Sequence, residues 1–251
     1  MTRRSGSELK RLAREFLLGN CSAVMAAMLT ASFLPAVLLL PFSTELTTGL
    51  NVAVVTYLIA AIILKLLGQL LSAGVLRMHL LLAQEQRPAF RDLFWTFRNR
   101  PDRFLLAATL LFIILLFPVA LAGVCIYCFL PDGAMEQAIF AAGVAAVLVF
   151  CELYLTYMFE MIYPLYIEHP DMTVVEGFRA SEKLMKGNKK RFFVLQLGFL
   201  GWQLLGVCSA GAGFLWISPY IRQTTANFYL DLTGGLDKKG IHIDASVDDR
   251  F

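Results

Sequence analysis

The chain has 251 residues, of which 58% are hydrophobic and only 16% are charged. Soluble domains carry about a quarter charged residues, so this composition argues against a soluble globular protein. The length suits one membrane domain, and the net charge of +3 gives no support for nucleic-acid binding beyond loop charges that a membrane topology explains.

The first predicted element is an amphipathic helix from Ser5 to Leu18. Its apolar residues recur at helical spacing, at Leu9, Leu12, Ala13, Phe16 and Leu17. Ser5 and Glu8 form a capping box at its start, and Gly19-Asn20 supplies a stop. The uncharged run from Cys21 to Phe42 then predicts a first span, because a bilayer core needs roughly 20 helical residues.

A second apolar helix is predicted to return from near Leu50 to about Ala83. It is interrupted by three ionisable residues, Lys65, Arg77 and His79. Charged groups are expensive inside a membrane, so each of them requires a partner or a function.

The second predicted repeat has the same design as the first. A short amphipathic segment begins at Pro88, carries Phe90, Leu93, Phe94 and Phe97 on one face, and breaks at Asn99-Arg100-Pro101. A third span is predicted from Phe104 to Leu130. The fourth runs from near Glu136 to about Ile167 and contains Glu152 and Glu160.

The third predicted repeat starts at Thr173, where Glu176 completes another capping box, and its amphipathic helix breaks at Gly187-Asn188. A fifth span continues from Phe192 to about Ala210. The segment from Phe214 to Leu232 contains Arg222 and could be a sixth span or a helix at the membrane interface. We favour the sixth span because the repeat requires a partner for the fifth.

These elements predict an all-α fold, a polytopic transmembrane helical bundle of about six spans. The expected organisation is a single membrane domain over 1–232, built from three helical-hairpin repeats at about 5–84, 88–168 and 173–232. Residues 233–251 are expected to form a polar cytoplasmic tail.

The distribution of Lys and Arg predicts the orientation of the spans. The three segments that precede the odd-numbered spans carry five, five and six basic residues, and the two intervening connections carry none. Positive loops stay in the cytoplasm, so the N-terminus and both basic loops are expected there. The apolar stripes of these segments either pack against the end of the bundle or lie in the anionic inner leaflet, and both can hold together.

The intramembrane charges are the candidate binding site: Lys65, Arg77, Glu152, Glu160 and Arg222. Lys65 and Glu152 should lie at one depth and could form an ion pair, and Glu160 could meet Arg77 or Arg222. The cluster is either a set of structural pairs or a polar site for an ion or a lipid headgroup.

Enzyme signatures are missing from the sequence, so we expect no catalytic residues and no cofactor. His79, His169 and His242 are isolated from other metal-ligating residues, which predicts no metal site. Gly211-Ala212-Gly213 lacks the strand and the lysine that phosphate-binding loops require.

Several segments of the third repeat resemble a known family. They are the run Ala180-Ser181-Glu182-Lys183-Leu184-Met185-Lys186-Gly187-Asn188-Lys189, then Leu200-Gly201-Trp202, Pro219-Tyr220 and Phe228-Tyr229-Leu230-Asp231-Leu232. They are similar to the conserved C-terminal half of domain of unknown function 975, a bacterial family of integral membrane proteins. The resemblance implies a helical bundle in the cytoplasmic membrane and no assigned activity.

Two functions are compatible with this sequence. The first is a non-enzymatic membrane protein that binds lipid or a membrane partner through its basic cytoplasmic face. Its partners would be anionic headgroups, another membrane protein or further copies of itself. The alternative is a transporter or lipid-translocating protein that uses the intramembrane charges. A water-accessible cavity at Glu152 or Arg222 would favour the alternative, and a sealed, paired core the first function.

Overall fold

A computed structural model describes residues 4–19, 21–44, 52–129 and 133–236. Within this part of the chain the fold is all helical, without a strand. The helices, in chain order, are α1 (Gly6–Leu17), α2 (Cys21–Thr44), α3 (Val52–Ala83), the 3-10 helix η2 (Phe90–Phe94), α4 (Trp95–Arg98), α5 (Pro101–Phe129), α6 (Ala134–Phe159), α7 (Ile162–Glu168), α8 (Val174–Met185), α9 (Lys189–Leu197), α10 (Leu200–Cys208) and α11 (Phe214–Thr233).

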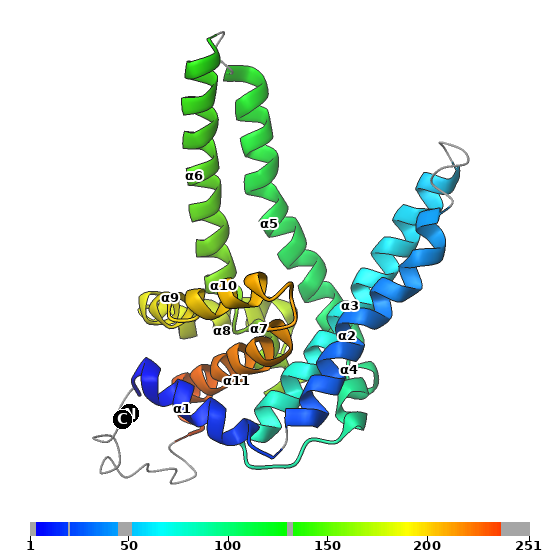
Figure 1. Cartoon of the computed structure of the whole chain (residues 1–251), viewed down its shortest axis with the longest axis vertical. Coiled ribbons are helices and arrows are strands. Elements are labelled where there is room, and N and C mark those ends of the chain that lie inside the picture. The colour runs from blue at the N-terminus through cyan, green and yellow to red at the C-terminus, as the bar shows by residue number, and fades with distance from the viewer. Residues whose placement is uncertain (1–3, 20, 45–51, 130–132, 237–251) are drawn as a thin grey trace.

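Two long helical hairpins, α2–α3 and α5–α6, rise from a common base and diverge (Figure 1). Their outward faces are apolar and exposed; Phe117 on α5 is 70% exposed and Phe150 on α6 is 71% exposed. Such surfaces are stable in lipid and would drive aggregation in water. Five helical segments in the described part of the chain are long and apolar enough to cross a membrane: Cys21–Phe42, Val54–Ala83, Pro101–Phe129, Met135–Glu168 and Lys189–Cys208.

The base consists of α1, η2, α4 and the helices from α7 to α11, together with the lower ends of the long hairpins (Figure 1). All three predicted basic segments lie in these base elements. The same type of hydrogen bond occurs at the start of each segment: a backbone N–H is donated to the carboxylate of the residue three positions later. The pairs are Ser5 with Glu8 at 2.6 Å, Ala89 with Asp92 at 2.8 Å and Thr173 with Glu176 at 2.9 Å.

The predicted helix breaks are present, and each has an identifiable cause. Gly19 and Gly187 have positive φ angles of 83° and 79°, which glycine adopts without the strain of a Cβ. Asn99 and Asn188 each donate a side-chain hydrogen bond to the carbonyl four residues earlier, at 3.0 and 2.8 Å. These bonds satisfy carbonyls that a helix leaves free at its end. Asn20 lies outside the described residues.

The third hairpin differs from the other two. Its fifth span is divided at Gly198–Phe199 into α9 and α10, and nine residues extend only about 14 Å as a helix. In Figure 1, α10 and α11 run across the base at a steep angle to α5 and α6.

The sixth span predicted over Phe214–Leu232 forms a helix, α11, but α11 is not among the segments apolar enough to cross a membrane. The reason is its polar C-terminal half, which is buried in protein. That half contributes Gln223, Thr224, Asn227 and Asp231 to the interior of the base.

The apolar stripe of α1 packs inside the protein. Leu9, Leu12 and Ala13 are buried, where α1 contacts α11, α3 and α9. The second predicted stripe behaves differently. Leu93 is buried, and the rings of Phe90, Phe94 and Phe97 are exposed and contact one another in sequence.

The predicted C-terminal tail begins inside the described residues, and its remainder lies outside them. Thr233 is the last residue of α11 rather than part of a loop. Gly234 comes next in the left-handed conformation, with φ of 73°, and ends the helix. Leu236 is buried against the core of the base.

Candidate functional site

A proline places one of the candidate residues at a helix break. Pro164 has no N–H to donate to the carbonyl of Glu160, and its ring would collide with that carbonyl in a continuous helix. The helix accordingly stops at Phe159, and α7 begins at Ile162 with Pro164 in its first turn. Glu160 therefore lies between two helices, at the junction of the long hairpin and the base.

Glu160 and Arg222 line the same cavity. Its volume is about 510 Å³, and its wall is built from α3, α5, α6, α7, α9 and α11. Leu76, Leu111 and Leu115 supply apolar wall. The other polar side chains that line it are Gln69, Ser72, Thr156, Tyr163, Gln196 and Thr225.

The two opposite charges in this cavity do not form an ion pair. They act on each other electrostatically, but no contact of 4.0 Å or less joins Glu160 and Arg222 in the described structure. Arg222 also lines an adjoining groove between α10 and α11, together with Gln203 and Ser218. Of the two partners that the sequence allowed for Glu160, the structure therefore brings Arg222 near it.

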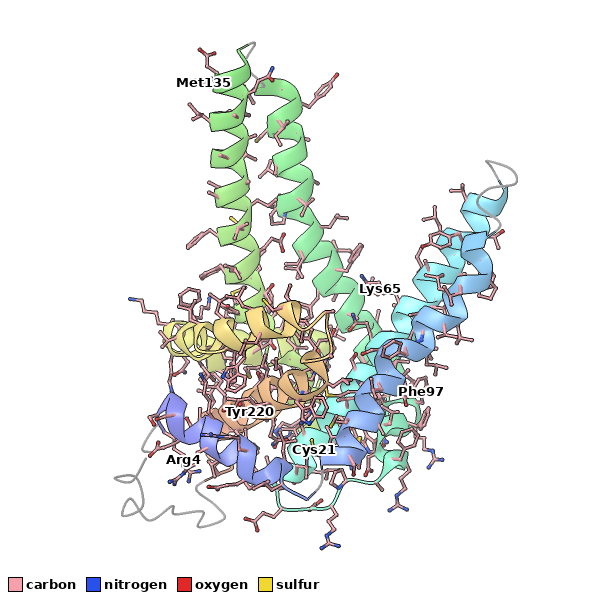
Figure 2. All side chains as sticks on the ribbon, viewed as in Figure 1. Arg4, Cys21, Lys65, Phe97, Met135 and Tyr220 are labelled. Carbon is pink, nitrogen blue, oxygen red and sulfur yellow. The ribbon has the colours of Figure 1, made fainter. Side chains whose placement is uncertain are left out.

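Lys65 and Glu152 do not line this cavity, and the ion pair expected between them is not formed within the described part of the chain. Lys65 is exposed on α3 above the base, with its ammonium 5.9 Å from the ring centre of Phe112 (Figure 2). One carboxylate oxygen of Glu152 is buried without a hydrogen-bond donor from the described residues. The reason is geometric. Equal distances along two helices give equal depths only where the helices run parallel, and the hairpins that carry Lys65 and Glu152 diverge.

Arg77 belongs to a different environment from Glu160. Its guanidinium lies 4.2 Å from the ring centre of Trp95, a cation–π arrangement, and Asp92 on η2 acts on it electrostatically. Arg77 thus helps to hold η2 and α4 against α3, and it does not line the cavity.

A buried hydrogen-bonded network fixes α11 beside the cavity. His79 Nδ1 donates to Gln223 Oε1 at 2.9 Å, and Gln223 Nε2 donates to the His79 carbonyl at 3.1 Å. Gln223 Nε2 also reaches Asn227 Oδ1, and Asn227 Nδ2 donates to the Leu9 carbonyl at 3.2 Å. Because Gln223 is the residue directly after Arg222, this network fixes the rotation of α11 and so directs Arg222 into the cavity.

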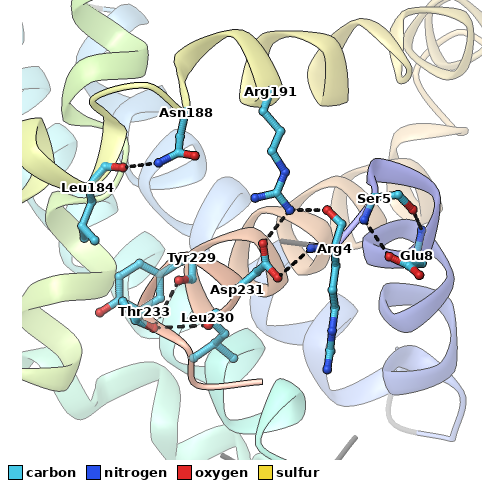
Figure 3. A network of polar contacts seen from close by, with 10 residues as sticks. All are labelled: Arg4, Ser5, Glu8, Leu184, Asn188, Arg191, Tyr229, Leu230, Asp231 and Thr233. Atoms are coloured by element: carbon cyan, nitrogen blue, oxygen red, sulfur yellow. Dashed lines mark hydrogen bonds and ion pairs between the residues drawn. The ribbon is translucent and has the colours of Figure 1, made fainter. Parts of the chain in front are cut away.

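A second network of hydrogen bonds holds the C-terminal end of α11 (Figure 3). Arg191 on α9 donates to Asp231 Oδ2 at 2.5 Å and to the carbonyl of Arg4, whose N–H donates to Asp231 Oδ1. Tyr229 donates its hydroxyl to Glu168 at 2.6 Å. Burial, reinforced by this bond, raises the pKa of Tyr229. Together these bonds tie α11 to α1, α7 and α9.

Several cavity residues were absent from the sequence-based site. Gln69 and Ser72 lie three residues apart on α3, and Thr156 precedes Glu160 by four on α6, so each pair shares a helix face. Uncharged polar residues at helical spacing in an apolar segment are the signal that could have identified them. No group of three or more His, Cys, Asp or Glu that could hold a metal ion occurs in residues 4–19, 21–44, 52–129 and 133–236.

Comparison with known proteins defines a family without assigning a function. The family model described as "Protein of unknown function (DUF975)" matches residues 1–235. No match was found among curated proteins or among solved structures. Since the match extends over nearly the whole chain, the protein belongs to the DUF975 family of proteins of unknown function.

Proposed function

We propose that this protein is a non-enzymatic, multi-pass protein of the bacterial cytoplasmic membrane that binds a zwitterionic lipid headgroup in the Glu160–Arg222 cavity. The observation that carries the proposal is a pair of opposite charges facing one cavity without contacting each other. Two such groups left apart suit a ligand that carries both charges: a phosphate for Arg222 and an ammonium for Glu160.

The surroundings of the cavity support an amphiphile rather than a small ion. The cavity volume of about 510 Å³ lies within the range of ligand sites. Its uncharged polar residues can hydrogen-bond the oxygens of a headgroup. Leu111 and Leu115 form its apolar side on α5, a helix whose outward face is apolar and exposed farther along. Acyl chains can therefore leave the cavity along the apolar outward face of α5.

Native mass spectrometry of the full chain, released from micelles with added phosphatidylethanolamine, tests this proposal. Glu160→Gln and Arg222→Gln should each lower the affinity for the lipid by about tenfold or more, since a charge-assisted hydrogen bond is worth roughly 1.5–3 kcal/mol. The matched controls are Glu152→Gln and Lys65→Gln, which remove the same charges outside the cavity. Unchanged binding in both cavity variants, with normal thermal stability, would exclude the site.

A second observation supports contact of the basic cytoplasmic face with anionic headgroups. Phe90, Phe94 and Phe97 are exposed on one short segment, whose flanking arginines are Arg87, Arg91, Arg98 and Arg100. Aromatic rings with neighbouring basic groups are the composition of segments that lie at a membrane interface. This arrangement is consistent with an N-terminus and base in the cytoplasm.

Transport or translocation of lipid is the alternative use of the same cavity. It is favoured by the cavity at Arg222 itself, which is the feature expected of a transporter, and by the adjoining groove between α10 and α11 that Arg222 also lines. Reconstituted vesicles that carry a fluorescent phosphatidylethanolamine distinguish the two. A lipid-binding protein leaves the leaflet exchange rate at that of protein-free vesicles, whereas a translocator raises it and loses this effect in Arg222→Gln.

A further inference from the structure

A separate basic groove lies between α1 and α9, and it shares no lining residue with the cavity of Glu160 and Arg222. Its volume is about 500 Å³, and α1, α9 and α11 line it. The lining contains three cationic side chains, Lys10, Lys190 and Arg191, and no acidic one. The remaining lining is small or apolar: Gly6, Ser7, Leu9, Val194, Leu195 and Phe228.

The cations of this groove retain unused hydrogen-bonding capacity. Arg191 is bound to Asp231 through Nη2, but its Nη1 is buried without an acceptor among the described residues. The ammonium of Lys10 lies 4.2 Å from the ring centre of Phe199, and the described structure gives it no carboxylate partner. Burial lowers the pKa of Lys10, so an anion beside it would stabilise its charged form.

The backbone of α1 adds to this preference for an anion. Gly6 and Ser7 are the first two residues of the helix, and N–H groups in a first turn have no acceptor one turn earlier. The positive end of the helix dipole lies at the same place and favours an anion there; the Glu8 carboxylate offsets part of this preference, because it accepts the Ser5 N–H at 2.6 Å. Gly6 also packs closely, since a Cβ there would approach Leu195 to 3.3 Å.

We propose that this groove binds the phosphate of an anionic phospholipid through Lys10 and Lys190, with the guanidinium of Arg191 adding positive charge to its wall. A lipid suits the groove better than free phosphate because α9 presents exposed apolar side chains directly after its cations. Phe193 and Val194 are 41% and 66% exposed, and Leu197 is 48% exposed one turn later. The headgroup would bind at the start of α9, and an acyl chain would lie along this apolar face.

The groove is separate from the Glu160–Arg222 cavity, and the two sites differ in the charge of the ligand that they select. The cavity contains one cation and one anion, whereas the groove contains cations only. Phosphatidylglycerol, whose headgroup is anionic, is therefore the probe for the groove. Phosphatidylcholine, which is zwitterionic, measures binding that does not depend on net charge.

The test is native mass spectrometry of the full chain titrated with each lipid. The double variant Lys10→Gln/Lys190→Gln should bind phosphatidylglycerol roughly tenfold or more weakly and leave phosphatidylcholine unchanged. Lys183→Gln/Lys186→Gln is the matched control, because it removes two exposed charges from α8 and the residue that follows it, outside the groove. A thermal unfolding curve like that of the wild type shows that each variant is folded.

Two results would overturn the proposal. Equal losses in the groove variant and the α8 control would mean that the net charge of the base attracts the lipid and no site exists. Displacement of phosphatidylglycerol by millimolar inorganic phosphate, at ionic strength matched with sodium chloride, would assign the groove to free phosphate. Retention of the lipid against phosphate, and its loss only in the groove variant, supports the lipid site.

Discussion

Gln223 is the residue on which the interior of the base depends most. It is fully buried and hydrogen-bonds both the side chain and the backbone of His79 as well as Asn227. An apolar residue at this position would leave the His79 Nδ1–H and the side-chain oxygen Oδ1 of Asn227 without these partners. Unsatisfied groups of this kind cost about 1–3 kcal/mol each.

We therefore predict that Gln223→Leu lowers the free energy of unfolding by at least about 2 kcal/mol. Gln203→Leu is the control, because Gln203 lines the groove beside α10 and is only partly buried. Thermal or denaturant unfolding of the purified protein in detergent measures both. Equal stability of the two variants would show that the His79 network contributes nothing to the fold.

Lys65 leads to the opposite prediction. Its ammonium forms no ion pair with Glu152, and its closest described partner is the ring of Phe112. A lysine near the centre of a span costs about 2.5–3.5 kcal/mol on insertion scales, so Lys65→Met should leave stability unchanged or raise it. The same unfolding assay tests this prediction: a clear loss of stability in Lys65→Met would mean that Lys65 has an ionic partner.

At the scale of single residues, sequence reasoning found the cavity charges Glu160 and Arg222, whereas the ion pair considered between Lys65 and Glu152 is not formed in the described part of the chain. Glu160 and Arg222 were identified because a charge in an apolar helix is conspicuous. Lys65, Glu152 and Arg77 were grouped with them on depth alone. Which neighbouring helix a charge faces depends on the packing angles between the helices, and the periodicity of the sequence does not encode those angles.

Among the elements, η2 packs closely against α3. A Cβ added to Gly74 on α3 would lie 1.9 Å from the carbonyl oxygen of Leu93, a backbone atom that cannot rotate away. We expect Gly74→Ala to displace η2 and α4 and to destabilise the protein by about 1–3 kcal/mol.

The control for Gly74 is Gly123→Ala on α5, where nothing lies within 4 Å of the added Cβ. Alanine favours a helix over glycine by up to about 1 kcal/mol, so this variant should be as stable as the wild type or more stable. Unfolding curves of the pair, with protease sensitivity near Arg87 as a second readout, test the packing of η2. Matching curves for both variants would contradict it.

The starts and stops of the elements could be read from the sequence because they have local causes. The capping boxes at Ser5 and Thr173 and the glycine stops at Gly19 and Gly187 occur where they were expected. The third hairpin could not be predicted in the same way. The burial of the polar half of α11 depends on contacts with α1, α2 and α3, which are distant in sequence.

For the whole molecule, the fold separates into two apolar hairpins and a polar, hydrogen-bonded base. The long apolar runs of the sequence predicted a helical membrane protein, since roughly 20 apolar helical residues span a bilayer core. The positive-inside pattern predicts in addition that the base, with its three basic segments, lies in the cytoplasm. The cavity and the groove then both lie where lipid headgroups of the inner leaflet can reach them.

Single-cysteine labelling in whole cells tests this arrangement most directly. The five native cysteines are first replaced by serine, and Met135→Cys at the far end of α6 is compared with Arg179→Cys on α8. A membrane-impermeant maleimide should label the Met135→Cys variant in intact cells and the Arg179→Cys variant only after the membrane is permeabilised. Labelling of the Arg179→Cys variant in intact cells, with Met135→Cys protected, would contradict the account.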